Sequence, residues 1–172
     1  YINLRWIGII GQFITINSVA IIFKFEFNFI LANIVVLIGI LSNIFLFYFF
    51  KKNQLEEKAS FIFLTLDILQ LSFLIYLTGG TINPFSIFLI IPSIFASNSL
   101  SIKTNILLIF ITISSIILIT FIHHELPSPL NEHTFNFYYY YSVPIALIIA
   151  LIFLSFFAIT FGQESTLRKD AL

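Results

Sequence analysis

One carboxyl group lies inside a long apolar stretch of this chain. Asp67 belongs to the run SFIFLTLDILQLSFLIYLTGG. In an α-helix, Gln70, Leu74 and Thr78 share its face, because each follows at a spacing of three or four residues. An ionised carboxylate inside a bilayer is costly unless it is paired, hydrated or protonated, so this face is predicted to point into a helix bundle. Asp67 is then a hydrogen-bonded anchor between helices, a group that senses a ligand or a proton, or a side chain exposed to lipid.

The second candidate site follows this helix directly, in the heptapeptide GGTINPF. Gly79 and Gly80 permit a positive φ and a close approach of the backbone. Asn83 suits a helix N-cap and Pro84 suits the first helical turn. The heptapeptide is therefore predicted to be a tight turn that leads into a fourth helix. Unpaired N–H groups and the positive end of the helix dipole would gather there, ready to bind a ligand carbonyl.

Aromatic side chains flank this turn in two pairs. Phe73 and Tyr76 lie three residues apart before it, and Phe85 and Phe88 lie three apart after it. Hydrogen-bond donors beside flat apolar surfaces suit a quinone headgroup, which has carbonyl oxygens and a ring that stacks. The spacing alone favours a plain connector between two helices, and it allows a quinone site without requiring one.

Apolar runs of about 20 residues, the length that spans a bilayer, must position these groups. The chain has 172 residues, of which only 9% are charged, against roughly 25% in soluble domains. We predict an all-α integral membrane bundle of six transmembrane helices. The expected spans are 4–23, 29–50, 60–78, 84–100, 105–122 and 138–161.

Lys and Arg placement predicts the orientation of this bundle, since cytoplasmic loops carry most basic residues. With both termini in the cytoplasm, Lys24 alone of the eight Lys and Arg residues lies outside. We expect a sensor domain over residues 1–162 and the start of a cytoplasmic linker over 163–172. The chain begins with Tyr1, not Met, and is interpreted as a segment of a longer protein.

The remaining polar groups indicate packing more than chemistry. Amides in apolar helices, such as Gln12, Asn43 and Asn98, are expected to form hydrogen bonds between helices. Ser93 and Ser97 favour close packing, and Pro92 is expected to kink the fourth helix.

No metal is expected. The histidines and acids of the loop after the fifth helix match no metal motif; they are His123, His124, Glu125, Glu132 and His133. The absence of cysteine excludes disulfides and thiol chemistry in this segment.

These motifs together resemble one family. GGTINPF matches GG-x-x-NPF, the heptapeptide of the RegB/PrrB family of redox-responsive sensor histidine kinases. The opening LRWIGIIGQ, with Arg5, Trp6, Gly11 and Gln12, is similar to that family's N-terminal signature. DILQLSFLIYLTGG resembles its third helix, and GQESTLRKDAL resembles the start of its linker. The resemblance covers nearly the whole chain.

The resemblance implies a membrane sensor that binds ubiquinone and passes the redox state of the quinone pool to a kinase core. It assigns quinone binding to Gly79, Gly80, Asn83, Pro84 and Phe85. Further sensing or packing residues are expected to be Asp67, Gln70, Phe73, Tyr76, Trp6 and Gln12. The family's phosphoacceptor histidine, ATP-binding boxes and redox-active cysteine lie downstream, so no catalytic residue is expected here.

The resemblance also implies a multi-pass protein of the bacterial inner membrane that forms a homodimer. A cognate response regulator is its expected partner through the kinase core, and no direct contact with nucleic acid is expected. The rival function is a small transporter or a subunit of a membrane complex. Such proteins usually carry charge networks inside the membrane, whereas the sequence shows no basic partner for Asp67 within an apolar span.

Overall fold

The computed structural model describes residues 2–50, 56–97, 100–127 and 136–170. Every regular element in these ranges is a helix, which confirms the predicted all-α class. The elements are α1 (Ile2–Ile21), α2 (Phe29–Phe50), α3 (Glu57–Tyr76), η1 (Gly80–Ile82), η2 (Pro84–Ile90), α4 (Ile91–Ser97), α5 (Ile102–Phe121) and α6 (Phe137–Asp170).

Side-chain caps fix where two of these helices begin. Asn28 Oδ1 accepts a hydrogen bond from Leu31 N at 3.1 Å, at the start of α2. Asn136 Oδ1 accepts one from Tyr138 N at 3.2 Å, at the start of α6. Each cap satisfies a backbone donor that has no partner within its own helix. The polar breaks between apolar runs thus set the helix ends.

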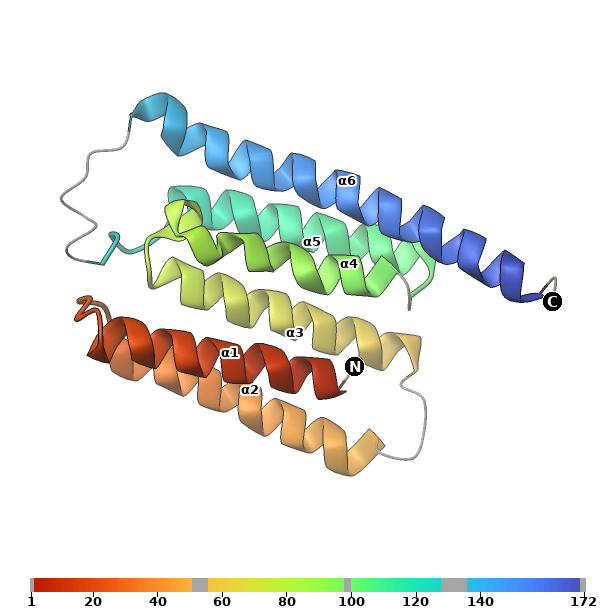
Figure 1. The fold of residues 1–172 in the computed structure, drawn as a ribbon, viewed down its shortest axis with the longest axis horizontal. Helices are drawn as coiled ribbons and strands as arrows, with labels where there is room; N and C mark the ends of the chain where they lie inside the picture. Colours follow the sequence, from red (N-terminus) through yellow and green to blue (C-terminus); the bar gives the residue numbers. More distant parts are fainter. Residues whose placement is uncertain (1, 51–55, 98–99, 128–135, 171–172) are drawn as a thin grey trace.

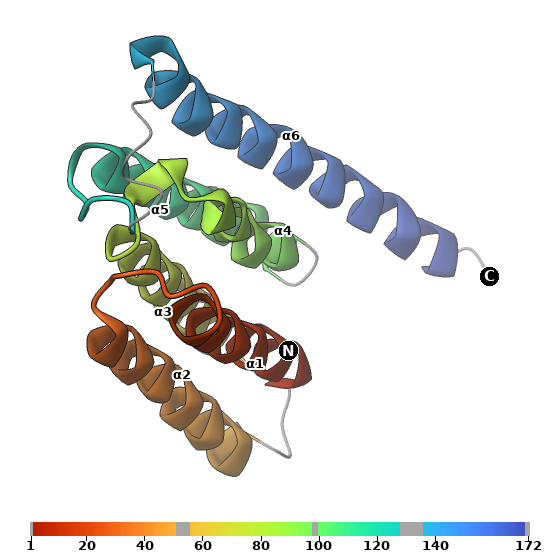
Figure 2. The ribbon, with the colours of Figure 1, turned by 60° about the vertical axis from the view of Figure 1, so that its left-hand side comes forward.

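The helices alternate in direction along the bundle (Figures 1 and 2). The start of α1, the end of α2, the start of α3 and the end of α6 lie at one end, which is on the right in Figure 1. The connectors 22–28, 77–83 and 122–127 lie at the opposite end. This arrangement matches the predicted sequence of crossings. Which end faces the cytoplasm stays a prediction from the positions of Lys and Arg.

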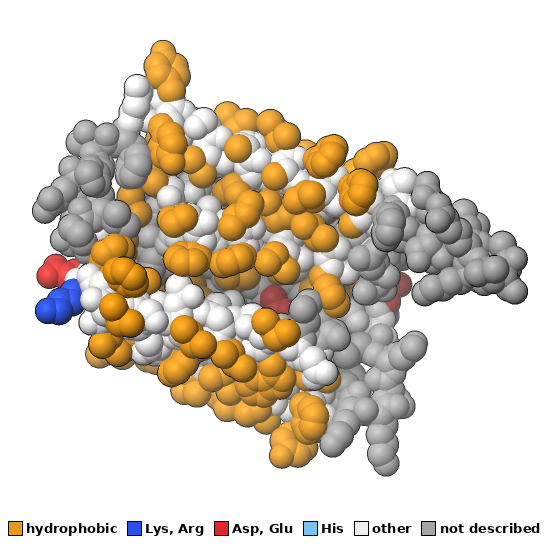
Figure 3. Space-filling view, viewed as in Figure 1, with side chains coloured by type: hydrophobic (Ala, Val, Ile, Leu, Met, Phe, Trp, Pro, Cys, Tyr) orange, Lys and Arg blue, Asp and Glu red, His pale blue; other side chains and the backbone are white. Residues whose placement is uncertain are grey.

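Within the described part of the chain, four helices are long and apolar enough to cross a membrane: 29–49, 57–76, 102–121 and 137–160. Two shorter apolar helical stretches, 5–21 and 84–97, complete the six crossing segments. Exposed apolar side chains cover the outer face of the bundle in Figure 3. Lipid is the solvent that such a surface requires.

The fourth segment differs from the predicted continuous helix. Residues 84–90 form a 3-10 helix, η2, and α4 begins only at Ile91. Pro92 consequently lies in the first turn of α4, where its missing N–H costs little. The predicted continuous fourth helix is therefore wrong, since the helix type changes next to Pro92, and the expected kink stays a prediction.

Two of the three buried apolar clusters in the described ranges hold the two sides of the bundle together. One joins α3, η2, α5 and α6 through Ile75, Leu89, Ile90, Ile116, Ile119, Leu147 and Leu151. The other joins α1, α2 and the end of α3 through Ile9, Ala32, Val35, Val36, Leu74 and Leu77. Among the described residues, no Cα atom of α1 lies within 8 Å of one in α3. Long side chains bridge the space between these two helices.

Candidate functional site

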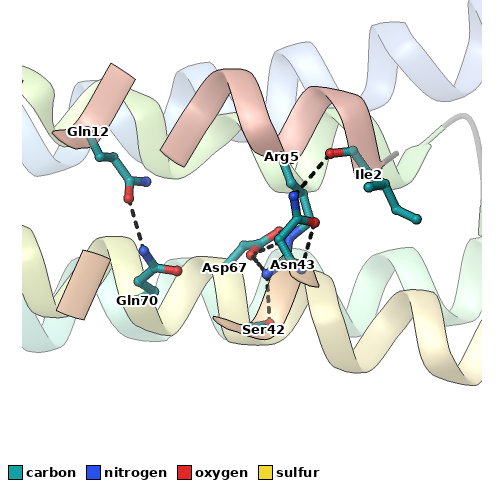
Figure 4. A network of polar contacts seen from close by, with 7 residues as sticks. All are labelled: Ile2, Arg5, Gln12, Ser42, Asn43, Asp67 and Gln70. Carbon is teal, nitrogen blue, oxygen red and sulfur yellow. Dashed lines mark hydrogen bonds and ion pairs between the residues drawn. The ribbon is translucent and has the colours of Figure 1, made fainter. Parts of the chain in front are cut away.

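Asp67 is paired with Arg5 of α1 (Figure 4). Arg5 Nη2 lies 2.6 Å from Asp67 Oδ1, and Nε donates to both carboxylate oxygens at 3.0 Å. The side chains are 4% and 19% exposed, respectively. The inference that Asp67 lacks a basic partner is therefore wrong. Of the three interpretations of Asp67, the geometry favours an anchor between helices.

Asp67 lies further from the start of its helix than the predicted span 60–78 implies. Because α3 begins at Glu57 and not at Ser60, Asp67 lies roughly 15 Å along the helix, near its midpoint. A lone carboxylate there would be costly. The guanidinium of Arg5 offsets this cost by donating to both carboxylate oxygens in the planar geometry that suits Arg.

The second helix completes this polar network. Arg5 Nη2 donates to Ser42 Oγ at 3.2 Å, and Nη1 lies 3.5 Å from Asn43 Oδ1. Asn43 is fully buried, and its Nδ2 donates to Ile2 O at 3.3 Å. Arg5 also lies over the ring of Phe63, 5.5 Å from its centroid. The network thus fastens α1, α2 and α3 to one another, as expected of the Asn43 amide.

A second polar bridge joins α1 to α3, closer to the GGTINPF turn. Gln70 Nε2 donates to Gln12 Oε1 at 3.0 Å, as Figure 4 shows. Behind the Gln70 amide lies Gly39 of α2, where an added Cβ would stand 2.5 Å from Gln70 Nε2. The bond confirms the predicted interhelical role of Gln12. A side chain at position 39 would require the Gln70 amide to move.

The GGTINPF segment forms the predicted tight turn. Gly79 and Gly80 have φ of 107° and 64°, values that favour glycine. Asn83 Oδ1 accepts from Phe85 N at 2.9 Å, and Asn83 Nδ2 donates to Thr78 O at 3.0 Å and to Thr78 Oγ1 at 2.6 Å. The N-cap role of Asn83 is therefore confirmed.

The donors at this turn are less available than predicted. The Phe85 N–H is bonded to the Asn83 side chain, and the Ser86 N–H to the Asn83 carbonyl. A ligand carbonyl would not find these two donors unpaired. The amide of Asn83 is likewise bonded at its oxygen and its nitrogen.

The space beside the two glycines is filled by the connector that follows α5. A Cβ on Gly79 would stand 2.6 Å from Leu126, and one on Gly80 would stand 2.6 Å from His123. His123 Nε2 lies 2.7 Å from the hydroxyl of Tyr140, which donates to the carbonyl of Thr120. The glycines thus allow another segment of the same protein, and not a ligand, to approach the turn closely.

A cleft of about 530 Å³ lies between α1 on one side and α3, η2 and α4 on the other. Its volume is in the range of small-molecule sites. The cleft extends from Asn83, Pro84 and Phe85 at the turn to Arg5 and Asp67 at the polar network. Most of its wall is apolar; the polar lining residues are Arg5, Gln12, Thr15, Asp67, Gln70, Thr78 and Asn83.

The structure brings only some of the predicted residues to this cleft. Gly79, Gly80, Phe73, Tyr76 and Trp6 are not among its lining residues. The rings of Phe73 and Tyr76 stack at 5.6 Å as a pair elsewhere on α3. Phe85 and Phe88, stacked at 5.9 Å, do line the cleft.

Two of the other polar candidates, Ser93 and His124, have structural partners. Ser93 Oγ lies 2.7 Å from Thr112 Oγ1, which joins α4 to α5. His124 N donates to the carbonyl of Tyr76 at 2.9 Å. In the described ranges no three His, Asp or Glu side chains gather as a metal site. Asn98, Glu132 and His133 lie outside the described residues.

Comparison with known proteins places the chain in a family. The family model for the PilS-like transmembrane domain matches residues 14–104, more than half of the chain. The chain belongs to this family. The sensor histidine kinase RegB of Cereibacter sphaeroides is 27% identical over 179 aligned residues, which cover 99% of this chain and 37% of that protein. No solved structure matches.

The sequence of this PilS-like membrane domain did not reveal the structural roles of two residues, Arg5 and Gly39. Arg5 is the partner of Asp67 and the centre of the polar network, and Gly39 supports Gln70. The available sequence signal for Arg5 was an arginine in the first turn of an otherwise apolar helix. No sequence signal identified Gly39, because a glycine in an apolar helix does not show which side chain packs on it.

Proposed function

We propose that this PilS-like membrane domain is the sensor domain of a histidine kinase, and that ubiquinone is the ligand of its cleft. The chain spans 37% of the length of its kinase relative, so kinase activity would belong to the full-length protein. A cognate response regulator and a homodimer in the bacterial inner membrane follow from the same proposal.

One observation carries the quinone assignment. The two segments that resemble the redox-sensor family, the opening LRWIGIIGQ and the heptapeptide GGTINPF, are more than 60 residues apart in the chain. Arg5 and Gln12 of the first line the same cleft as Asn83, Pro84 and Phe85 of the second. A mostly apolar cleft with a few polar groups suits a hydrophobic molecule that carries carbonyl oxygens.

The path of the signal would begin at this cleft and end at α6. The cleft borders α3, η2 and α4, and α4 packs against α6. Helix α6 continues without a break to Asp170, through the expected domain boundary at 162. A ligand that binds two arrangements of these helices unequally would shift the population between them, and α6 would carry the change toward the kinase core.

The Arg5–Asp67 pair removes one sequence argument against the rival transporter, since transporters also carry charges inside the membrane. The similarity to a sensor histidine kinase over 99% of the chain favours the sensor. A phosphoacceptor histidine and ATP-binding boxes in the sequence beyond Leu172 would decide between them.

Paired variants test whether the cleft binds ubiquinone. Phe85 and Ile87 both lie in η2 and are 41% and 47% exposed, but only Phe85 lines the cleft. In calorimetric titrations of the domain in nanodiscs, Phe85→Ala should weaken ubiquinone binding through lost contact area, whereas Ile87→Ala should leave it unchanged. Equal affinities in the wild type and both variants would contradict the proposed site.

A further inference from the structure

Three sets of polar side chains along the cleft differ in how readily they could form hydrogen bonds with a ligand. At the turn, Asn83 is bonded to Thr78 and to the Phe85 N–H. At the other end, Arg5 and Asp67 bind each other within a network that includes Ser42. A neutral headgroup that displaced either partner of this ion pair would leave a buried charge without its counter-ion, which is costly.

The amide pair between these ends is different. Gln12 and Gln70 share one hydrogen bond, from Gln70 Nε2 to Gln12 Oε1. An amide has two N–H donors and a carbonyl that accepts two bonds, so this single bond leaves Gln12 Nε2 as a donor and Gln70 Oε1 as an acceptor. Both residues are half-buried and both line the cleft.

The surroundings hold this pair in place. No Cα atom of α1 lies within 8 Å of one in α3, so the two glutamines extend across the cleft from opposite walls. The Gln70 amide rests against Gly39, where a Cβ would meet its nitrogen, oxygen and carbon at 2.5 to 2.9 Å. A side chain supported from behind presents its polar atoms in a fixed direction, which lowers the entropic cost of binding.

We infer that Gln12 and Gln70 bind the oxygens of the quinone headgroup and distinguish its oxidised from its reduced form. This inference rests on the proposed quinone site and moves the headgroup from the turn to the middle of the cleft. Gln12 Nε2 donates to a quinone carbonyl. Gln70 Oε1 accepts from a quinol hydroxyl, a bond that the quinone cannot form because it has no donor. The turn and Phe85 then border the isoprenoid tail.

Two substitutions separate these roles. Gln12→Met and Gln70→Met keep the side-chain length and remove the amide. The Gln12 variant should bind ubiquinone about fivefold more weakly, which is the effect of one lost hydrogen bond. The Gln70 variant should lose a similar factor for ubiquinol and less for ubiquinone. Affinities of a short-chain ubiquinone and its quinol are measured anaerobically by calorimetry on the 172-residue chain in nanodiscs.

A matched control is present in the same bundle. Asn17 Nδ2 donates a hydrogen bond to Asn33 Oδ1 at 3.2 Å, which joins a side-chain amide of α1 to one of α2. Neither residue lines the cleft. Asn17→Leu should therefore change neither affinity. Gly39→Ala displaces the Gln70 amide without removing it, so this variant should weaken ubiquinol binding selectively. If a methionine variant does not fold, Gly39→Ala tests whether Gln70 binds the quinol.

The outcomes distinguish the two levels of the proposal. A wild-type domain that binds both forms, with unchanged affinities in both methionine variants, would overturn the inference and leave the proposed function standing. A wild-type domain that binds neither form would overturn the proposed function and the inference with it. A changed ratio of quinone to quinol affinity in Gln70→Met, absent from Asn17→Leu, is the expected result.

Discussion

Replacing Asp67 by leucine should destabilise the domain through its effect on Arg5. The Arg5 side chain is 4% exposed and makes three contacts of 3.0 Å or less to the carboxylate. Removing one partner of a buried ion pair costs about 3–5 kcal/mol in soluble proteins. Because Asp67 is 19% exposed, we expect a loss near the lower limit, about 3 kcal/mol, which is roughly a hundredfold in the folding equilibrium.

Two further variants test the cause of this loss. Asp67→Asn keeps an oxygen that can accept from Arg5 but loses the charge, so its cost should be smaller, about 1–2 kcal/mol. The double variant Arg5→Met/Asp67→Leu replaces the pair by apolar side chains, which is often close to neutral, and should recover most of the stability. The exposed carboxylate Glu125 supplies the control: Glu125→Leu should change the stability little.

Reversible unfolding of all variants in detergent micelles gives the coupling energy of the pair as a double-mutant cycle. We expect the double variant to be at least 1 kcal/mol more stable than the sum of the single effects, a conservative bound for residues in direct contact. Additive single effects would mean that the stability contributed by Arg5 does not depend on Asp67, contrary to the geometry of the pair.

Three other changes probe the turn and the topology. Asn83→Ala should lower the unfolding free energy by about 1 kcal/mol in a thermal melt, because it removes the cap of η2; an unchanged melt would contradict the capping role. Gly80→Ala should cost roughly 1–3 kcal/mol in the same assay because its φ is 64°, whereas Gly11→Ala, which meets nothing within 4 Å, should be neutral or stabilising; equal effects would exclude backbone strain. Reporter fusions at Asn53 and Pro129 should report cytoplasmic and external sides respectively, and a shared side would overturn the predicted orientation.

Helices and turn could be predicted because their signals are local. Apolar runs of about 20 residues identified all six crossing segments. Asn83 and Pro84 identified the start of the fourth segment, since a cap and a first-turn proline act within three residues of one another. The 3-10 geometry of 84–90 was not predictable, because its side chains give no signal that separates it from an α-helix.

Contacts between distant residues could not be read from the sequence. Arg5 and Asp67 are 62 positions apart, and Gln12 and Gln70 are 58 apart. Their pairing depends on how α1 lies against α3, and helix periodicity fixes only which face of each helix is polar. The glycines show the same limit: their positive φ was expected, but that Leu126 and His123 fill the space beside them follows only from the fold.

If a quinone occupies the cleft between α1 and α3, filling that cleft should displace it. Gly8 lines the cleft, and a Cβ there would meet nothing within 4 Å, so Gly8→Leu places an apolar side chain in open space. Ser114→Leu adds the same side chain at an exposed position of α5 outside the cleft. In nanodisc calorimetry, Gly8→Leu should lose ubiquinone binding at least tenfold, a cautious estimate for occluding a site, while Ser114→Leu retains it. Wild-type affinity in Gly8→Leu would contradict the account.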